Sequence, residues 1–216
     1  MTRWGRTTAV CALSSVALLG TSPLASAATH HRRHKTIHHR HRRATRHAPT
    51  HHVTQCANAD TPATSAPVDA MRVAVVCLVN QQRTQRGLPS LTASVQLDNS
   101  AQSWNDVMVS TGLFTHGPGN AFSGRISAAG YDWQSAGENI ATGYLTPRGV
   151  VKAWMASLDH CQNILEPSYR DVGTGETPSG VSSQQSGPAT WTQDFGLQAS
   201  QSAASSNHGP QNGCPY

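Results

Sequence analysis

Residues 171–197 read DVGTGETPSGVSSQQSGPATWTQDFGL, and this stretch decides between an all-helical and a mixed fold. Its two ends, residues 171–176 and 189–197, are short segments bounded by turn-forming residues, a pattern typical of strands. Between them, residues 178–188 are rich in Gly, Ser and Gln and indicate a connecting loop. The stretch therefore predicts a β-hairpin near the C-terminal end of the folded part.

Upstream of the hairpin, helical patterns dominate. Asp69 is expected to cap a first helix, whose apolar run at residues 73–79 covers most faces and indicates burial. Thr146 followed by Pro147 is a strong start signal for a later helix, because proline fits the first helical position. The predicted helices are residues 69–86, residues 94–111 (ended by Gly112), residues 122–129 (ended by Gly130) and a segment that starts at residue 147. Helices packed on a small sheet define an α+β fold.

The termini differ in composition from this body. Residues 1–27 have two arginines, a short apolar core and a small-residue cleavage pattern, which together predict a secretory signal peptide. An uncleaved signal anchor is the alternative. Residues 28–68 are expected to form a disordered His/Arg-rich arm and linker, and residues 199–216 a C-terminal tail. The folded domain is thus expected at residues 69–198, with no transmembrane span in the mature chain.

Charge is distributed unevenly along the chain. The 216 residues carry a formal net charge of +5, but no Asp or Glu precedes Asp60. Residues 30–52 hold 7 Lys or Arg and 9 His, whereas residues 60–216 hold 7 basic and 11 acidic residues. The predicted domain is therefore mildly acidic, which argues against sequence-specific nucleic-acid binding. The arm is the part expected to attract an anionic cell-envelope polymer.

Four cysteines remain once the signal is removed, and an even number in an exported chain favours two disulfides. Three pairings are open. We favour Cys56–Cys77, which joins the end of the arm to the first helix, and Cys161–Cys214, which anchors the tail. A zinc site built on these cysteines is not expected, because the sequence has no CxxC pair.

Three residues in the predicted domain are candidates for chemistry: His116, Glu138 and His160. Each alone is more often structural, as a hydrogen-bonded His at a helix end or a Glu that holds a loop. Two imidazoles and one carboxylate can also hold a divalent metal with an open position. Without metal they can share protons in a polar cavity. Spacing alone does not show that the three converge.

Six short motifs connect these residues to a known family. Residues 74–196 resemble the bacterial branch of the CAP superfamily (cysteine-rich secretory proteins, antigen 5 and pathogenesis-related 1 proteins), whose domain is also called SCP. In order, the motifs are VNQQR, GLP and Leu91 (residues 79–91), FTH (114–116), RI and AGY (125–131), GENIA (137–141), WMAS, His160 and NIL (154–165), and DVGTG with WTQDFG (171–196).

The resemblance implies a three-layer α-β-α sandwich with a small antiparallel sheet and a shallow central cavity. It implies that His116, Glu138 and His160 line this cavity and are its candidate metal ligands, with zinc or another divalent ion as the cofactor. Eukaryotic relatives typically have two His and two Glu there. This sequence departs from that pattern, because Ser157 stands in place of the second Glu and Thr190 in place of a His.

Two functions follow as hypotheses. The first is a secreted binding module that takes a lipid or another small hydrophobic or envelope-derived ligand in or near the cavity. The alternative is a metal-assisted hydrolase, a peptidase or envelope-polymer hydrolase, in which His116, Glu138 and His160 are the catalytic residues. In both cases the protein is expected to be secreted, extracellular or loosely envelope-associated.

Overall fold

The hairpin predicted from residues 171–197 forms the centre of the fold. In the computed structural model, β3 (Asp171–Thr177) and β4 (Thr190–Gln198) pair antiparallel, with Val172 opposite Phe195. The predicted signal peptide and basic arm lie outside the described residues. The structure describes residues 55–119, 121–184, 187–203 and 209–215.

The sheet has four strands in the order β1-β3-β4-β2. β2 pairs antiparallel with β4, but the two-residue β1 pairs parallel with the start of β3, so the sheet is mixed rather than antiparallel throughout. This parallel pairing arises because the segment just before α2 runs alongside the start of β3. The remaining elements are α1 (Val68–Thr84), β1 (Thr92–Ala93), α2 (Val95–Thr111), α3 (Ala121–Ala128), β2 (Trp133–Thr142), α4 (Pro147–Met155) and α5 (Leu158–Leu165), with short 3-10 turns at Ala63–Ser65, Ser182–Gln184 and Pro210–Asn212.

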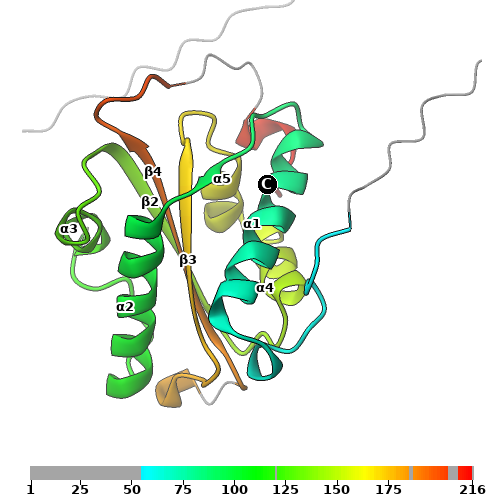
Figure 1. Cartoon of the computed structure of the whole chain (residues 1–216), viewed down its shortest axis with the longest axis vertical. Helices are drawn as coiled ribbons and strands as arrows, with labels where there is room; N and C mark the ends of the chain where they lie inside the picture. Colours follow the sequence, from blue (N-terminus) through cyan, green and yellow to red (C-terminus); the bar gives the residue numbers. More distant parts are fainter. Residues whose placement is uncertain (1–54, 120, 185–186, 204–208, 216) are drawn as a thin grey trace, which may run out of the picture. The chain divides into compact units, whose positions relative to one another are not determined.

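The helices cover both faces of the sheet (Figure 1). α2 and α3 lie on one face, and α1, α4 and α5 lie on the other. The main hydrophobic core fills the second interface and includes Trp154, Trp191 and Phe195, all at most 1% exposed. The predicted α+β class and three-layer α-β-α arrangement are therefore confirmed.

Glycines in β3 set how closely α2 approaches the sheet. A Cβ atom at Gly173 would collide with the backbone of Leu97 and Asp98 in α2. At Gly175 it would lie 2.5 Å from the backbone of Ala101. Since only glycine leaves this space, the GTG part of the quoted stretch permits backbone-to-backbone packing of α2 on β3.

The helix boundaries follow the predicted signals, with one correction. Ser94 caps α2 through a bond from Leu97 N, and Gly112 ends it in the left-handed conformation at φ 70°. Thr146 accepts a hydrogen bond from Gly149 N at the start of α4. The prediction that Asp69 caps the first helix is wrong, because α1 already begins at Val68.

Both favoured disulfides are present. Cys56–Cys77 links the described start of the chain to α1, and Cys161–Cys214 links α5 to the tail. Residues that the sequence analysis assigns to the linker also pack against the domain, since Ala59 and Ala63 are buried in the main core.

Two elements that carry site residues were not predicted. β2 contains Gly137, Glu138 and Asn139, residue types that are depleted in strands, so it lacks the usual pattern. α5 has only eight residues and follows α4 after Ala156 and Ser157, so the two helices appear as one segment in the sequence.

Candidate functional site

The three candidate residues come from three different elements. His116 lies in the loop that follows α2, Glu138 lies in the middle of the edge strand β2, and His160 lies in the first turn of α5. Gly112 ends α2 four residues before His116, and Gly117 adopts φ 83° immediately after it. These two left-handed glycines turn the loop so that His116 faces β2.

Glu138 is the centre of the site. Its side chain is 1% exposed, and its two oxygens have different partners. Oε1 lies 2.7 Å from His116 Nδ1, and Oε2 accepts a 2.6 Å hydrogen bond from Arg125 Nη2. The carboxylate therefore sets the orientation of the His116 ring, which remains 45% exposed toward the cavity and solvent.

Arg125, in α3, belongs to the site but is not among the site residues predicted from the sequence. Besides its ion pair with Glu138, it donates a 3.2 Å hydrogen bond to the carbonyl oxygen of His116 and stacks 3.8 Å above the ring of Trp104. Trp104 in turn donates from Nε1 to the carbonyl oxygen of Thr115. The RI motif at residues 125–126 was the available signal, but sequence does not show that this Arg faces Glu138.

His160 lines the same cavity but does not bind Glu138. Its Nδ1 lies 2.9 Å from Ser157 Oγ, and its backbone carbonyl accepts a 3.1 Å hydrogen bond from Asn139 Nδ2. Burial lowers the pKa of His160, the nearby His116 lowers it further, and Asp159 partly opposes both effects. A lowered pKa favours the neutral imidazole at neutral pH.

Two adjoining cavities meet at this site. The more polar one, about 540 Å³, is lined by His116, Glu138, Asp159, His160 and Asn163, among others. The more apolar one, about 320 Å³, includes Tyr144, Ala153, Trp154 and Ser157 in its lining. Three residues belong to both cavities: Phe114, Ile140 and His160.

In this arrangement the proposed metal ligands bind one another or neighbouring residues. Among the described residues, no group of three or more His, Cys, Asp or Glu side chains is placed to hold a metal ion. Each Glu138 oxygen has a partner, and His160 Nδ1 faces Ser157. Thr190, which stands in place of a family His, donates its hydroxyl to the carbonyl of Ser179. Metal binding by this site stays a prediction.

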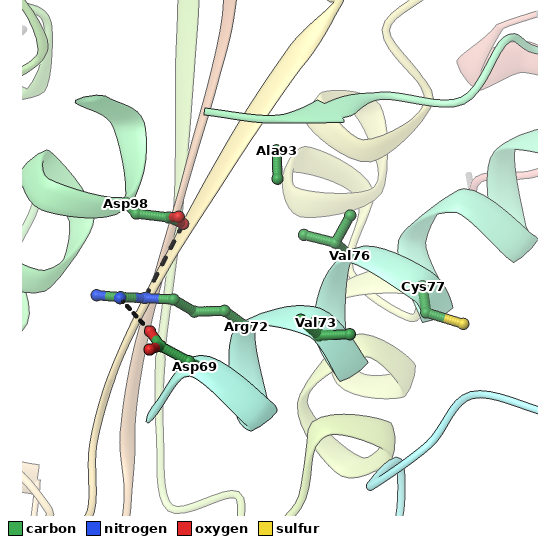
Figure 2. A pocket seen from close by; sticks show the side chains of 7 residues that line it. All are labelled: Asp69, Arg72, Val73, Val76, Cys77, Ala93 and Asp98. Carbon is green, nitrogen blue, oxygen red and sulfur yellow. Dashed lines mark hydrogen bonds and ion pairs between the residues drawn. The ribbon is translucent and has the colours of Figure 1, made fainter. Parts of the chain in front are cut away.

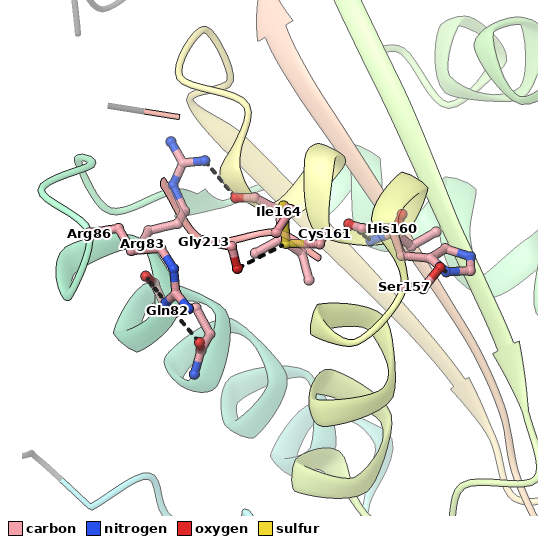
Figure 3. Close-up of a disulfide and its surroundings, with 10 residues drawn as sticks. Gln82, Arg83, Arg86, Ser157, His160, Cys161, Ile164 and Gly213 are labelled. Atoms are coloured by element: carbon pink, nitrogen blue, oxygen red, sulfur yellow. Dashed lines mark hydrogen bonds between the residues drawn. A yellow bond between two sulfur atoms is a disulfide. The ribbon is translucent and has the colours of Figure 1, made fainter. Parts of the chain in front are cut away.

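The disulfide of the tail lies directly behind the site (Figure 3). Cys161 is fully buried and follows His160 in α5, so its bond to Cys214 fixes the helix on the side away from the cavity. The buried guanidinium of Arg83 in α1 donates to the carbonyl oxygens of Ile164 and Glu166 at the other end of α5. The middle and the C-terminal end of α5, which carries His160 and follows Ser157, are therefore held.

A third cavity, of about 470 Å³, lies against α1 and the start of α2, away from these residues (Figure 2). Arg72 lies there between Asp69 and Asp98, at 2.9 and 4.0 Å. Burial raises the pKa of Asp98, although a hydrogen bond from Thr174 N and the charge of Arg72 oppose the rise. Since Arg72 also donates to the carbonyl of Thr174, these charges tie α1 and α2 to β3.

Comparison with known proteins identifies the family. The family model "CAP: Cysteine-rich secretory protein family" matches residues 76–208, and the chain belongs to this family. A relative from Bacillus subtilis (strain 168), "Uncharacterized protein YkwD", is 38% identical over 137 residues, which are 61% of this chain and 50% of the relative. The chain thus spans about half the length of this curated relative.

Solved structures share the fold. An extracellular protein containing an SCP domain from Bacillus anthracis str. Ames matches with a TM-score of 0.51 and 23% identity, over 62% of this chain and 45% of that chain. An outer surface protein from Borrelia burgdorferi matches with a TM-score of 0.50 and 17% identity, over 57% of this chain and 90% of that chain. At these identities the likeness shows the fold alone.

Proposed function

We propose that this protein is an extracellular CAP-domain binding module whose ligand is a small amphipathic molecule, such as a lipid or another envelope-derived compound. The two disulfides suit an oxidising compartment, and the related SCP-domain protein from Bacillus anthracis is described as extracellular. No helix within the described ranges is long and apolar enough to cross a bilayer.

One observation carries the proposal, namely that the two cavities adjoin, because both are lined by Phe114, Ile140 and His160. An apolar ligand segment fits the smaller cavity against Trp154 and Tyr144. The polar end of the same ligand then reaches His116 and the other polar groups of the larger cavity. Pockets of this size with an apolar lining and a few polar groups are the usual form of small-molecule sites.

The electrostatics of the site favour a ligand with a hydrogen-bonding head rather than a strongly anionic one. Glu138 is already neutralised by Arg125, and its second oxygen is occupied by His116. What remains available is the exposed edge of the His116 ring together with His160. Imidazole nitrogens form hydrogen bonds, which suits hydroxyl, amide or ester groups.

Filling the apolar cavity tests the proposal. Ala153 lines it, and Ala153→Leu should occupy part of its volume. The matched control is Ala128→Leu, at an exposed position of α3 on the other face of the sheet. Exported protein is incubated with envelope lipid extract, and bound ligand is measured by native mass spectrometry and by the shift in melting temperature. Wild type and Ala128→Leu should bind, and Ala153→Leu should not.

Two outcomes speak against the proposal. One is the absence of any bound ligand or thermal shift in the wild type across lipid and envelope extracts. The other is binding by Ala153→Leu that equals binding by the control, which would place the ligand elsewhere.

A further inference from the structure

We propose that Ser157 and His160 form a nucleophile–base pair that hydrolyses a small carboxylic ester held in the apolar cavity. This activity goes beyond ligand binding, because it requires the ligand to be cleaved. It rests on the proposed function, since the substrate occupies the same cavity.

Ser157 is placed as a helix cap but is not used as one. It is the N-cap residue of α5, and its side chain accepts no hydrogen bond from the first turn of that helix. A serine at this position normally accepts such a bond, which stabilises the helix. Here Oγ lies 2.9 Å from His160 Nδ1 instead, as Figure 3 shows for the two neighbouring side chains. The hydroxyl is therefore within proton-transfer distance of an imidazole.

His160 is placed to act as a base. Its Nδ1 faces the Ser157 hydroxyl at 2.9 Å, and its partly buried ring lines both cavities. In the tautomer with its proton on Nε2, Nδ1 accepts the hydrogen bond from the Ser157 hydroxyl. The hydrogen bond from Asn139 to the His160 carbonyl fixes this turn of α5 against β2.

The surroundings fit an acyl group. Ser157 and His160 both line the 320 Å³ cavity, whose other walls include Phe114, Ile140 and Trp154. An acyl chain in this space would place its carbonyl carbon beside Ser157 Oγ. The backbone N–H groups in the first turn of a helix have no acceptor within the helix. The first-turn N–H groups of α5, at whose N-cap Ser157 stands, are therefore the candidate donors to the carbonyl oxygen as it gains negative charge.

The reaction balances with water as its co-reactant. Ser157 Oγ attacks the ester carbonyl carbon while its proton passes to His160 Nδ1, giving a tetrahedral intermediate. The bond from this carbon to the alkoxy oxygen breaks, and the departing oxygen takes the proton, so that an alcohol leaves and the acyl group stays on Ser157. Water then gives a proton to Nδ1 and attacks the acyl carbon. The bond between the acyl carbon and Ser157 Oγ then breaks, Oγ takes the proton back from His160 Nδ1, and the carboxylic acid is released.

The test uses the full exported chain, with p-nitrophenyl butyrate as substrate and a fluorophosphonate as a covalent serine label. Wild type should release p-nitrophenolate, and peptide mapping should find the label on Ser157. Ser157→Ala should lose the label and reduce turnover by roughly 100-fold or more, the usual size of an acid–base and nucleophile contribution. His160→Gln should also lose both. Ser110→Ala removes an exposed hydroxyl of α2 and should match the wild type.

The nine histidines of residues 30–52 hydrolyse activated esters weakly by themselves, and Ser157→Ala retains them as the background. Equal turnover of Ser157→Ala and wild type, or a label on another residue, overturns the proposal. If the wild type binds envelope lipid but neither cleaves the ester nor takes the label, only the hydrolase proposal fails. If it also binds no ligand, the binding proposal fails as well. Retained ligand binding by Ser157→Ala shows that this variant is folded.

Discussion

Glu138 lies directly opposite Asp194 across the β2–β4 pair, and both residues are buried, at 5% and 1% exposure of the whole residue. Burial is the main reason why the pKa of Asp194 lies well above its usual range, and the charge of Glu138 raises it further. Asp194 thus holds its proton to a higher pH than an ordinary aspartate. Asp194 therefore favours its protonated form beside a Glu138 side chain that is bound by His116 and Arg125.

Asp194→Asn tests this assignment, because an amide has nearly the shape of a protonated carboxyl. A raised pKa in the folded state means that folding takes up a proton, so the free energy of unfolding falls as pH rises above the pKa of the unfolded chain. Asparagine has no carboxyl proton to lose, so the free energy of unfolding of Asp194→Asn does not fall with pH in this way. It should match the wild type near pH 4 and be more stable at pH 8 in denaturant titrations. Asp132→Asn, at an exposed position, controls for net charge. A variant destabilised equally at both pH values would contradict the protonated state.

Arg125 and Glu138 should be strongly coupled. Arg125→Met leaves the buried carboxylate without its cation, which should lower the free energy of unfolding by about 3 kcal/mol. Adding Glu138→Gln should restore much of this loss, giving a coupling of about 2 kcal/mol in a double-mutant cycle.

The matched surface pair is Arg148–Asp60, with side chains 48% and 70% exposed. Arg148→Met should cost less than about 1 kcal/mol. Equal costs at the two sites would mean that Glu138 does not depend on Arg125.

The fold was largely predictable because its signals are local. Caps such as Ser94 and Thr146, and the terminator Gly112, act through adjacent backbone groups, so sequence alone places the helices around them. β2 was missed because it is a strand through its pairing with β4 rather than through the propensity of residues such as Gly137 and Glu138. A neighbouring strand and its register do not appear in the local pattern.

The site was only partly predictable for the same reason. Motifs identified His116, Glu138 and His160, and the structure brings the first two together and places the third in the same cavity. Arg125 and Asp194 reach Glu138 only through the packing of α3 and the register of β4. Contacts between elements this far apart in sequence cannot be derived from spacing.

Glu176 should make stability decrease as pH rises toward neutrality. It is 3% exposed in β3, and burial raises its pKa to about 7, although the charge of Arg72 opposes the rise. The folded state therefore keeps a proton that the unfolded chain loses above about pH 4.5. From there to about pH 7, this residue should remove up to roughly 3 kcal/mol of the free energy of unfolding.

Glu176→Gln isolates this contribution, because the other buried acids are common to both proteins. The difference in stability between variant and wild type should grow in favour of the variant as pH rises from 4.5 to 7 and then level off. Urea titrations at intervals of half a pH unit measure it. Parallel curves for the two proteins would show that Glu176 does not titrate in this range.

Gly173 should tolerate no side chain. Gly173→Ala forces a Cβ atom into the backbone of α2 at Leu97 and Asp98, and should cost about 3 kcal/mol or more. Gly124→Ala is the matched control, because it lies inside α3 with open space around its Cβ position. There alanine should be neutral or stabilising by up to about 1 kcal/mol. Melting temperatures of both variants give the comparison, and a mild effect at Gly173 would show that α2 can move away from β3.

The basic arm should retain the protein at anionic surfaces independently of the folded domain. Residues 30–52 hold 7 Lys or Arg, whereas residues 60–216 have an excess of acidic residues, so attraction to anionic polymers is expected from the arm alone. Deleting residues 30–52 should abolish salt-sensitive retention on anionic envelope polymer, measured as the salt concentration that elutes the protein.

Two further variants separate the contribution of the Lys and Arg charges from that of the His charges. Replacing the 7 Lys and Arg by Gln should remove most retention at pH 7.5. Replacing the 9 His by Gln should leave it intact but remove its increase at pH 5.5, since histidine becomes charged below about pH 6.5. Unchanged retention after the deletion would assign the interaction to another part of the chain.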